Sequence, residues 1–351
     1  MRSPVPSPSS EREGATGPCS FIQGLLLINR SSDTIKNMGR NELINTTRAI
    51  LAKAGFDVSS ALSIRGISFD VVAKLDDRVL IVKILSNVDA FSKENANDMK
   101  TLADALGATP LVVGERSSSG DLEAGIVYSR FNISIVSNET LADLLLEDSP
   151  PFIFAAPGGL YVRLDSDLLK RTREGLGMSL GALAEIAGVS RRTIQMYESG
   201  MGAMIDAALR IEESLGLPII EPIDPFEFKH EDRNKEKRDE HAPVDVFAVN
   251  QLCNLGFSVR PVVRSPFEAV SSNSSSLMLT SYGADDEHLA QRALVASNIA
   301  RILDNFSVLI VEKKHERDSI DSTAVVSNEE LKKIDAPEDL TDLVASRRSG
   351  R

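Results

Sequence analysis

The chain has 351 residues, of which 42% are hydrophobic and 26% charged, and its formal net charge is −12 at pH 7. This composition is typical of a globular protein with two or three domains, and it excludes a basic protein that coats nucleic acid without regard to sequence. Two cysteines, Cys19 and Cys253, are too few for a disulfide framework or a cysteine-rich metal cluster. No apolar run reaches the roughly 20 residues needed to cross a bilayer, so we expect a cytoplasmic protein.

Residues 1–37 are rich in Ser, Pro and Gly and show no hydrophobic period, which predicts a disordered leader. The short apolar stretch 21–28 lacks a small-residue cleavage site, which argues against a secretory signal. Met38 stands just before the first periodic segment and is an alternative start of translation.

Residues 38–150 alternate between helical and strand-like patterns and predict a small α/β module. Asp76-Asp77 lies between two β-rich runs, which predicts a hairpin. The expected elements are a helix over 42–55 that ends at Gly55, strands over 69–77 and 78–85, a helix over 93–106, strands over 110–115 and 133–136, and a helix that starts within 137–147.

Residues 163–217 form a helical block, in which we expect three short helices over 166–174, 180–188 and 190–199. Asp165, Ser179 and Ser190 are suited to the N-cap positions of these helices, because their side-chain oxygens accept backbone N–H groups. Residues 218–243 are charged and nearly without core residues, which predicts a linker. A further α/β module is expected over 244–351.

This second module repeats features of the first in the same order. Gly55-Phe56 recurs as Gly256-Phe257, Phe69-Asp70 recurs as Phe267-Glu268, and "IVSNETL" at 135–141 recurs as "VVSNEEL" at 325–331. We infer a duplicated α/β module with a helical domain inserted between the copies. The alternative is that the two modules are unrelated α/β domains that share common β-rich sequence patterns.

The link between the second and third helices of the central block consists of Gly188, Val189 and Ser190. So short a turn requires a residue that tolerates positive φ, which Gly188 provides, and a small residue where the helices touch, which Ala184 provides. Ile194 and Val189 then fill the shared core together with Leu183. Ala184, Gly188 and Ile194 have the spacing of a helix-turn-helix.

With its paired caps and "YESG" at 197–200, the block resembles the Cro/repressor-type helix-turn-helix domain. The wider stretch "GGLYVRLDSDLLKRTREGLGMSLGALAEIAGVSRRTIQMYESG" is similar to a family of archaeal HTH-type transcriptional regulatory proteins. The resemblance implies that Arg173 pairs with Glu198 and that Tyr197 lies in the core. It also implies that the third helix enters the major groove of DNA.

The resemblance implies DNA contacts from the third helix, where arginine suits guanine and glutamine suits adenine. The candidate DNA-binding residues are Ser190, Arg191, Arg192, Thr193, Gln195 and Met196. The alternative is that Arg191 and Arg192 are ordinary solvated charges at the start of a helix. Against it, each cation there interacts unfavourably with the helix dipole, by roughly 0.3–1 kcal/mol.

The chain departs from the family at one position of the second helix. This helix commonly opens with a Gln that supports a backbone contact, and here Leu180 takes that place. Lys170 and Arg171 are possible substitutes for a contact to phosphate.

The first module is similar in element order to the restriction-endonuclease-like fold. Nucleases of that fold hold Mg²⁺ with two carboxylates and use a lysine beside them. Asp70 and Lys83 match the first acid and the lysine, but Ile81 takes the place of the second acid. In the second copy, Glu268 corresponds to Asp70 and roughly Thr280 to Ile81, and no lysine corresponds to Lys83. We expect degenerate modules in which Asp70 and Lys83 are surface or interdomain residues.

The predicted fold class is therefore a multidomain α/β plus all-α chain, in which a lambda-repressor-like helix-turn-helix bundle lies between two similar small α/β modules. The predicted function is a sequence-specific, non-enzymatic transcriptional regulator that binds double-stranded DNA as a homodimer on a palindromic site. We expect no bound metal, no cofactor and no membrane contact. A helix-turn-helix-targeted endonuclease and a protein-interaction scaffold remain the alternatives. The role of the α/β modules, as dimer surfaces or as sensors of a ligand, is left open.

Overall fold

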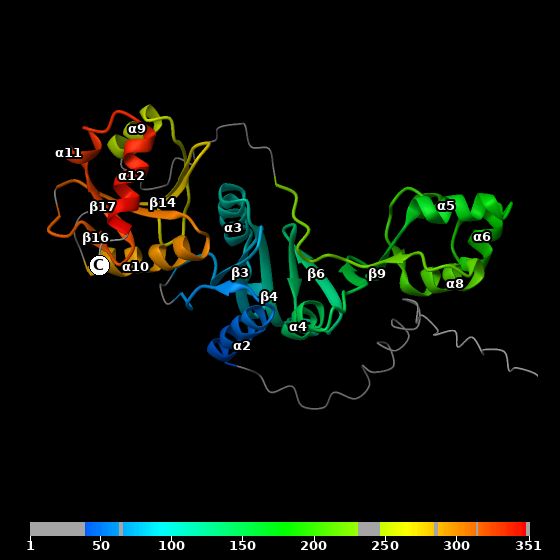
Figure 1. The fold of residues 1–351 in the computed structure, drawn as a ribbon. Coiled ribbons are helices and arrows are strands. Elements are labelled where there is room, and N and C mark those ends of the chain that lie inside the picture. Colours follow the sequence, from blue (N-terminus) through cyan, green and yellow to red (C-terminus); the bar gives the residue numbers. More distant parts are fainter. Residues whose placement is uncertain (1–38, 63–65, 231–245, 284–286, 314, 349–351) are drawn as a thin grey trace, which may run out of the picture. The chain divides into compact units, whose positions relative to one another are not determined.

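The structure is a computed structural model that describes residues 39–62, 66–230, 246–283, 287–313 and 315–348. The leader predicted over 1–37 and residues 231–245 of the predicted linker lie outside the described residues. The described chain forms two compact units (Figure 1). Residues 152–223 form the helix-turn-helix unit, and residues 39–151 together with 224–348 form the α/β unit.

The first module of the α/β unit contains residues 39–151. Strands β2 and β3 form the predicted hairpin, whose turn places Asp76 at φ +50°. β3 and β4 are parallel and are connected by α3, and the strands follow the order β1-β2-β3-β4-β7-β6, with β5 on β4. The elements are α2 (Arg40–Lys53), β1 (Asp57–Val58), β2 (Val71–Leu75), β3 (Arg78–Asn87), a 3-10 helix (Val88–Ala90), α3 (Lys93–Leu106), β4 (Thr109–Ser117), β5 (Gly120–Asp121), β6 (Ile126–Arg130), β7 (Ile133–Val136) and α4 (Asn138–Leu146).

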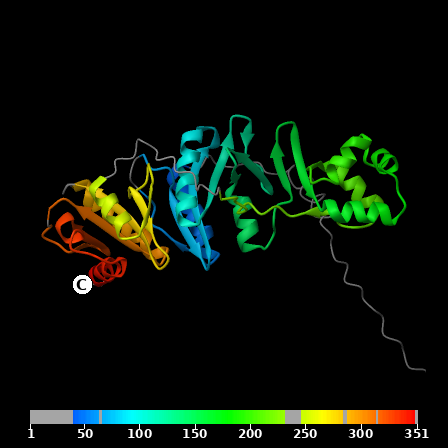
Figure 2. The same ribbon diagram turned by 90° about the horizontal axis from the view of Figure 1, so that it is seen from above.

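The second module has the same strand order and the same strand directions, β12-β13-β14-β15-β17-β16. Its strands and helices are coloured yellow to red in Figure 2. The register also agrees, because Val71 pairs with Val82 in the first module and Ala269 pairs with Thr280 in the second. The duplication stays a prediction, which this shared topology supports. The elements are α9 (Val246–Asn254), β12 (Ser258–Pro261), β13 (Ala269–Ser272), β14 (Leu277–Gly283), α10 (Glu287–Ile302), β15 (Phe306–Val311), β16 (Ser319–Ile320), β17 (Thr323–Ser327), α11 (Asn328–Leu331) and α12 (Pro337–Arg348).

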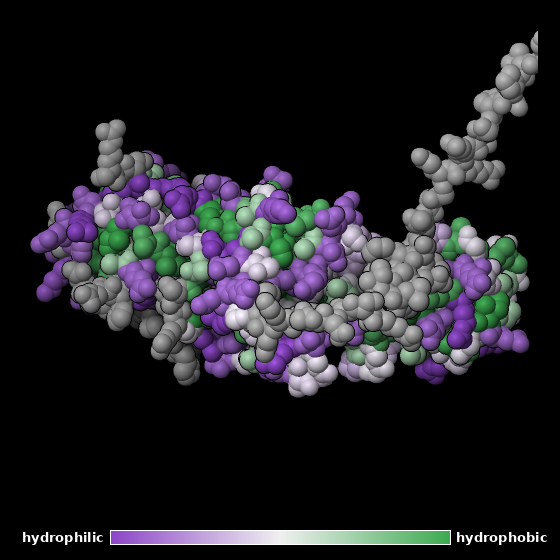
Figure 3. All heavy atoms as spheres, turned by 90° about the horizontal axis from the view of Figure 1, so that it is seen from below, coloured by the Kyte–Doolittle hydropathy of each residue, from purple (hydrophilic) through white to green (hydrophobic). Residues whose placement is uncertain are grey.

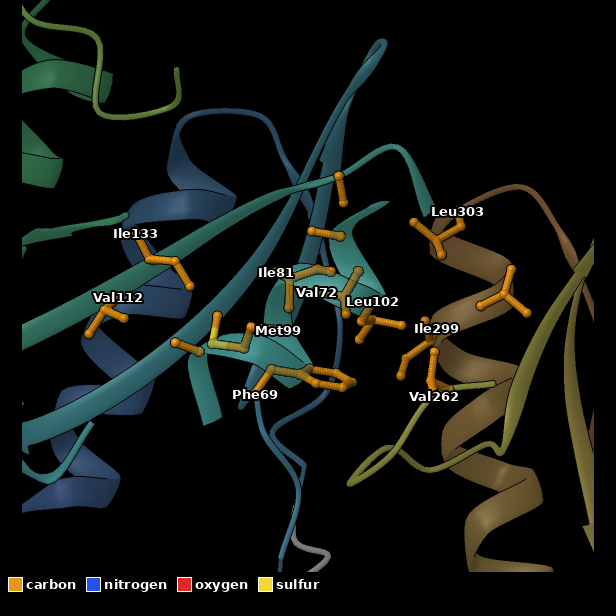
Figure 4. Close-up of a cluster of buried hydrophobic side chains, with 14 of the residues drawn as sticks. Phe69, Val72, Ile81, Met99, Leu102, Val112, Ile133, Val262, Ile299 and Leu303 are labelled. Atoms are coloured by element: carbon orange, nitrogen blue, oxygen red, sulfur yellow. The ribbon is translucent and has the colours of Figure 1, made fainter. Parts of the chain in front are cut away.

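The two modules share one hydrophobic core (Figure 4). The first module contributes side chains from β2, β3 and α3, and the second contributes side chains from the segment before β13 and from α10. Members of this core that are labelled in Figure 4 are Phe69, Val72, Ile81, Met99, Leu102, Val112, Ile133, Val262, Ile299 and Leu303. The modules therefore fold as one unit rather than as two independent domains.

Polar contacts across this core are reciprocal. Asp98 on α3 of the first module binds Arg264 of the second at 2.6 Å. In return, Lys74 on β2 of the first module binds Asp304 at 2.6 Å, directly after α10. Asn298 on α10 also accepts the backbone N–H of Ser60 at 3.0 Å. Each module thus presents the helix between its two parallel strands to the loop and strand region of the other.

The helix-turn-helix unit contains a β-hairpin in addition to its helices. β8 and β9 pair through a turn in which Gly158 has φ +101°, and β9 also pairs with β10 and β11. The sequence analysis did not predict this hairpin, although Pro157 and Gly158 between two short apolar runs are a turn signal that could have identified it. The elements are β8 (Ile153–Ala156), β9 (Gly159–Leu164), α5 (Ser166–Gly175), α6 (Leu180–Ala187), α7 (Arg191–Tyr197), β10 (Ala203–Met204), α8 (Ile205–Leu215) and β11 (Ile220–Glu221).

The start of the predicted linker contains several buried side chains, although the sequence analysis expected the linker to be nearly without core residues. Ile219, Ile220, Ile223 and Phe226 are all buried. Ile220 lies opposite Leu164 in the pairing of β11 with β9, and the buried carboxylate of Glu212 accepts the N–H groups of Ile219 and Ile220 at 2.7 and 2.9 Å. None of the described helices combines the length and the apolar character needed to cross a membrane.

Helix α10 offers a matched test of the shared core. Ile299 is fully buried between the modules, whereas Leu294 on the same helix is 53% exposed. We expect Ile299→Ala to lower the free energy of unfolding by about 2–5 kcal/mol, since it leaves a cavity, and Leu294→Ala to change it by less than about 0.5 kcal/mol. Urea unfolding of both variants measures the difference, and equal effects would contradict a core shared between the modules.

Candidate nucleic-acid interface

Helix α7 exposes one face and buries the other. Ser190 caps the helix, since its Oγ accepts the N–H of Thr193 at 3.1 Å. Ile194 and Tyr197 are buried at 0% and 2% exposure and fix the helix to the unit. The side chains of Arg191, Arg192, Gln195 and Met196 are exposed. The predicted base-contacting residues therefore lie together on the exposed face of α7.

The turn before α7 depends on Gly188, which has φ +70° at the C-cap of α6. A Cβ atom at this position would lie 2.5 Å from Nη1 of Arg210 on α8. The same Arg210 nitrogen donates to the carbonyl oxygen of Ala187 at 3.3 Å and so closes the end of α6. Ala184 is buried and Val189 is half-buried between the helices. Arg210 was not predicted, because nothing in the local pattern marks a contact from α8.

A bidentate ion pair joins α5 to the end of α7. Arg173 Nε donates to Glu198 Oε1 at 2.5 Å and Nη2 donates to Oε2 at 3.0 Å, with both side chains about nine-tenths buried. Nη1 donates to the carbonyl oxygen of Met178 at 3.0 Å, so the guanidinium is well satisfied. The hydrogen bond to Glu198 raises the pKa of Arg173. The geometry is the pairing that the family resemblance implied.

The two arginines of α7 form no ion pair with any described residue, although both lie at the positive end of the helix. A cation at this end of a helix interacts unfavourably with the helix dipole, by roughly 0.3–1 kcal/mol. An anion bound there would offset this cost. The hydroxyl of Ser190, which caps the helix, lies 2.8 Å from the hydroxyl of Thr193, so both hydroxyls lie beside the same surface. On α5, Lys170 and Arg171 are exposed. The arrangement is a local cationic face on an acidic chain.

Leu180 opens α6 as a half-buried apolar side chain. It offers no hydrogen-bonding group where the family usually has a glutamine. Arg171 Nε donates to the carbonyl oxygen of Asp167 at 3.2 Å, which directs that side chain along its own helix. Among the two proposed substitutes for a phosphate contact, Lys170 has no such restraint in the described structure.

The sequence analysis expected Asp70 and Lys83 to be surface or interdomain residues, but both are buried within the first module, at 4% and 8% exposure. Lys83 Nζ lies 3.4 Å from Asp70 Oδ2. Arg40 of α2 binds Asp70 Oδ1 at 2.6 Å, and the N–H of Ile84 donates to Oδ2 at 2.8 Å. Burial lowers the pKa of Lys83, while the neighbouring Asp70 opposes this shift. The sequence analysis did not identify Arg40 as the partner of Asp70, because no motif links the two residues.

The second module retains part of this arrangement. Glu268 accepts the N–H of Tyr282 at 3.1 Å, as Asp70 accepts that of Ile84, and it forms an ion pair with Arg292 of α10. The register places Leu279 opposite Val270 as Ile81 lies opposite Val72. Leu279, not Thr280, therefore corresponds to Ile81, because Thr280 pairs one position further along. No described group of three or more His, Cys, Asp and Glu side chains could hold a metal ion.

Comparison with known proteins gives two matching domains and close relatives of nearly full length. Residues 40–151 match the PD-(D/E)XK superfamily domain, and residues 169–221 match a helix-turn-helix domain. A protein of Halobacterium salinarum is 40% identical over 315 residues, covering 88% of this chain and 98% of the relative. Proteins of Halorubrum lacusprofundi and Methanospirillum hungatei are 40% and 36% identical over 88% of this chain and 98% and 99% of their own length.

Each of these relatives is named "Putative HTH-type transcriptional regulatory protein". No solved structure has significant similarity to the chain.

The Arg173–Glu198 pair can be tested by a double-mutant cycle. We expect Arg173→Met and Glu198→Gln each to lower the free energy of unfolding by about 3–5 kcal/mol, because each leaves a buried polar partner uncompensated. The double variant should lose clearly less than the sum, since it removes both partners together. Thermal or urea unfolding of the four proteins measures the coupling, and additive losses would show that the pair does not join α5 to α7.

Proposed function

The chain belongs to the archaeal family of HTH-type transcriptional regulatory proteins, and we propose that it is a sequence-specific DNA-binding regulator that places α7 in the major groove. The observation that carries the proposal is the exposed pair Arg191 and Arg192, which have no ionic partner among the described residues at the positive end of α7. Anionic phosphates and the acceptor atoms of guanine are the partners that this geometry fits.

The roles of the exposed α7 residues follow from their chemistry. The planar guanidinium of arginine can bind O6 and N7 of guanine together, and the amide of Gln195 can bind adenine in the same bidentate way. Met196 offers an apolar contact of the kind that suits the thymine methyl group. Ser190 and Thr193 lie at the helix start, where their hydroxyls and backbone N–H groups are suited to phosphate.

We further propose that the protein binds a palindromic site as a dimer. A single chain carries one matched helix-turn-helix domain, whose α7 has only seven residues and spans about 10 Å. Two such helices on one face of DNA, about 34 Å apart, read two half-sites and give the discrimination that one short helix lacks. Binding should weaken as salt rises, because cationic contacts to phosphate release counterions from DNA. The net charge of −12 confines such contacts to a small surface of the chain.

The α/β unit has a binding or structural role in this proposal rather than a catalytic one. The match to the PD-(D/E)XK superfamily makes a DNA endonuclease the second candidate. Against it, Ile81 supplies no second carboxylate, and Arg40, Lys83 and a backbone N–H already occupy the oxygens of Asp70. A single carboxylate so engaged is a poor ligand for Mg²⁺, which prefers several oxygen ligands.

DNA binding by α7 is tested with Arg191→Ala combined with Arg192→Ala. Each bidentate contact to guanine is worth about 1–3 kcal/mol, so we expect the double variant to bind a selected operator about 30-fold or more weakly. Selection from a random duplex pool supplies the operator, and fluorescence anisotropy measures affinity. Lys53→Ala with Lys333→Ala removes two exposed cations of the α/β unit and controls for net charge. Equal affinity of both double variants would refute reading by α7 and favour an interaction scaffold.

Catalysis is tested by incubating the protein with supercoiled plasmid and with operator DNA in the presence of Mg²⁺ or Mn²⁺. We expect no cleavage, because the site offers the metal only one engaged carboxylate. Metal-dependent cleavage that disappears in Asp70→Ala would instead establish the endonuclease. The variant's operator affinity serves as the check that the helix-turn-helix unit remains folded.

A further inference from the structure

We propose that Arg210 of α8 binds a phosphate of the DNA backbone from beside the turn that joins α6 to α7. The inference rests on the proposed function and deepens it, because it adds a phosphodiester-binding residue that lies outside the recognition helix. It also addresses the departure at Leu180, which offers phosphate no hydrogen-bonding group. Arg210 binds a different phosphate, since it lies at the other end of α6, which is about 12 Å long.

The guanidinium of Arg210 lies against the backbone of the turn. α8 packs beside α6 in the helix-turn-helix unit (Figure 1). Nη1 of Arg210 donates to the carbonyl oxygen of Ala187 at 3.3 Å, and Cζ lies 3.7 Å from the position that a Cβ atom on Gly188 would occupy. A side chain at Gly188 would meet Nη1 at 2.5 Å, so glycine permits this close approach. The arginine is therefore held at the turn rather than extended along its own helix.

Most of the hydrogen-bonding capacity of Arg210 is unused in the free protein. A guanidinium has five N–H donors in a rigid fork. The described structure gives Arg210 one hydrogen bond, to Ala187, and no ion pair. Its side chain is exposed, so an anion can reach the remaining donors. Arginine can thus keep its contact to α6 while it binds a phosphate oxygen with other N–H groups.

Two acidic residues of α8 are spaced to pair with Arg210, but neither does so. Asp206 lies four positions before it and Glu213 lies three positions after it, and both spacings favour an ion pair on a helix. The guanidinium turns instead to the C-terminal end of α6, where a cation interacts favourably with the helix dipole. That interaction accounts for one hydrogen bond, and it leaves the charge of Arg210 without an anionic side chain among the described residues.

The turn brings Arg210 to the end of α7 that we propose to enter the major groove. Gly188 precedes Arg191, the first residue of α7, by three positions, so their Cα atoms are at most about 11 Å apart. The major groove is about 12 Å wide. A cation beside Gly188 is therefore within reach of the wall of the groove when Arg191 contacts base edges, and phosphates form that wall.

The charge of the chain makes single cations important for this contact. The net charge of −12 confines contacts to phosphate to local cations. On the face of the helix-turn-helix unit seen at the right of Figure 3, hydrophilic side chains lie in patches between hydrophobic ones. Arg210 adds a cation from α8 to Arg191 and Arg192 of α7. The three arginines approach the same end of the recognition helix from two different elements.

The test compares Arg210→Gln with Arg301→Gln in the full chain, by fluorescence anisotropy on the selected operator over a range of salt. Arg301 is an exposed arginine of α10 without an ion pair among the described residues, and its replacement removes the same charge. We expect Arg210→Gln to weaken operator binding about 10-fold or more, because a hydrogen bond to a charged group is lost. The slope of log affinity against log salt should fall by about 0.9 for each bound chain. Arg301→Gln should match wild type.

The salt slope distinguishes a phosphate contact from a purely structural role. If Arg210 only closed the end of α6, Arg210→Gln would weaken binding without changing the slope, because no counterion-releasing contact would be lost. An unchanged slope would therefore overturn the proposal. The loss should also be equal on an unrelated duplex, since a phosphate contact carries no sequence information. Circular dichroism shows whether the variants are folded.

A conservative variant keeps the test valid if Arg210→Gln unfolds. Arg210→Lys retains a cation at the end of α6 but loses the rigid fork that can hold a carbonyl oxygen and a phosphate together. Operators in which single phosphates are replaced by neutral methylphosphonates locate the contact. We expect one position in each half-site at which this replacement weakens wild type clearly more than Arg210→Lys. Equal losses for both proteins at every position would overturn the proposal.

The two double and single variants together separate this inference from the proposed function. If Arg191→Ala with Arg192→Ala weakens operator binding and Arg210→Gln leaves the salt slope unchanged, the proposed function stands and the inference fails alone. If Arg210→Gln lowers the slope and the α7 double variant binds like wild type, the phosphate contact stands and reading by α7 fails. A wild-type chain that binds no duplex would overturn both.

Discussion

The buried ion pair between Arg173 and Glu198 fixes the orientation of every side chain assigned to DNA. α7 has only seven residues, too few to be stable on its own, so its direction depends on what it packs against. Ile194 and Tyr197 bury one face, but apolar contacts alone allow a short helix to rotate. The bidentate geometry, with the third nitrogen of Arg173 bound to Met178, removes that freedom. The face that we propose to contact bases is thereby set in the free protein, so that less ordering would be required on binding.

The same principle of satisfied charge explains the α/β unit. Residues 40–151 match the PD-(D/E)XK superfamily domain. In the first module the carboxylate of Asp70 is bound by Arg40 and Lys83, and in the second module that of Glu268 is bound by Arg292. A buried carboxylate without a cation is costly, so side-chain cations compensate it in both modules. The two modules use different elements for this, α2 in the first and α10 in the second.

The sequence predicted most of what local signals determine. Asp165, Ser179 and Ser190 cap the helices for which they were assigned, α3 spans the predicted 93–106, and the Asp76-Asp77 hairpin forms. The relationship to archaeal regulators is confirmed. Long-range contacts could not be predicted in this way. Arg210 closes the end of α6 from another helix, and Arg40 reaches Asp70 across 30 positions. Ile219 and Ile220 are buried where β11 adds to β9.

The shared core of the α/β unit has a consequence for symmetry. α3 and α10 occupy corresponding places in their modules, and each contacts the loop and strand region of the other module, which is the reciprocity of a two-fold interface. The chain nevertheless carries one matched helix-turn-helix domain, inserted between the modules, and so its internal symmetry stops at the α/β unit. The palindromic site that we propose requires two recognition helices, and the internal symmetry of the α/β unit does not supply the second one.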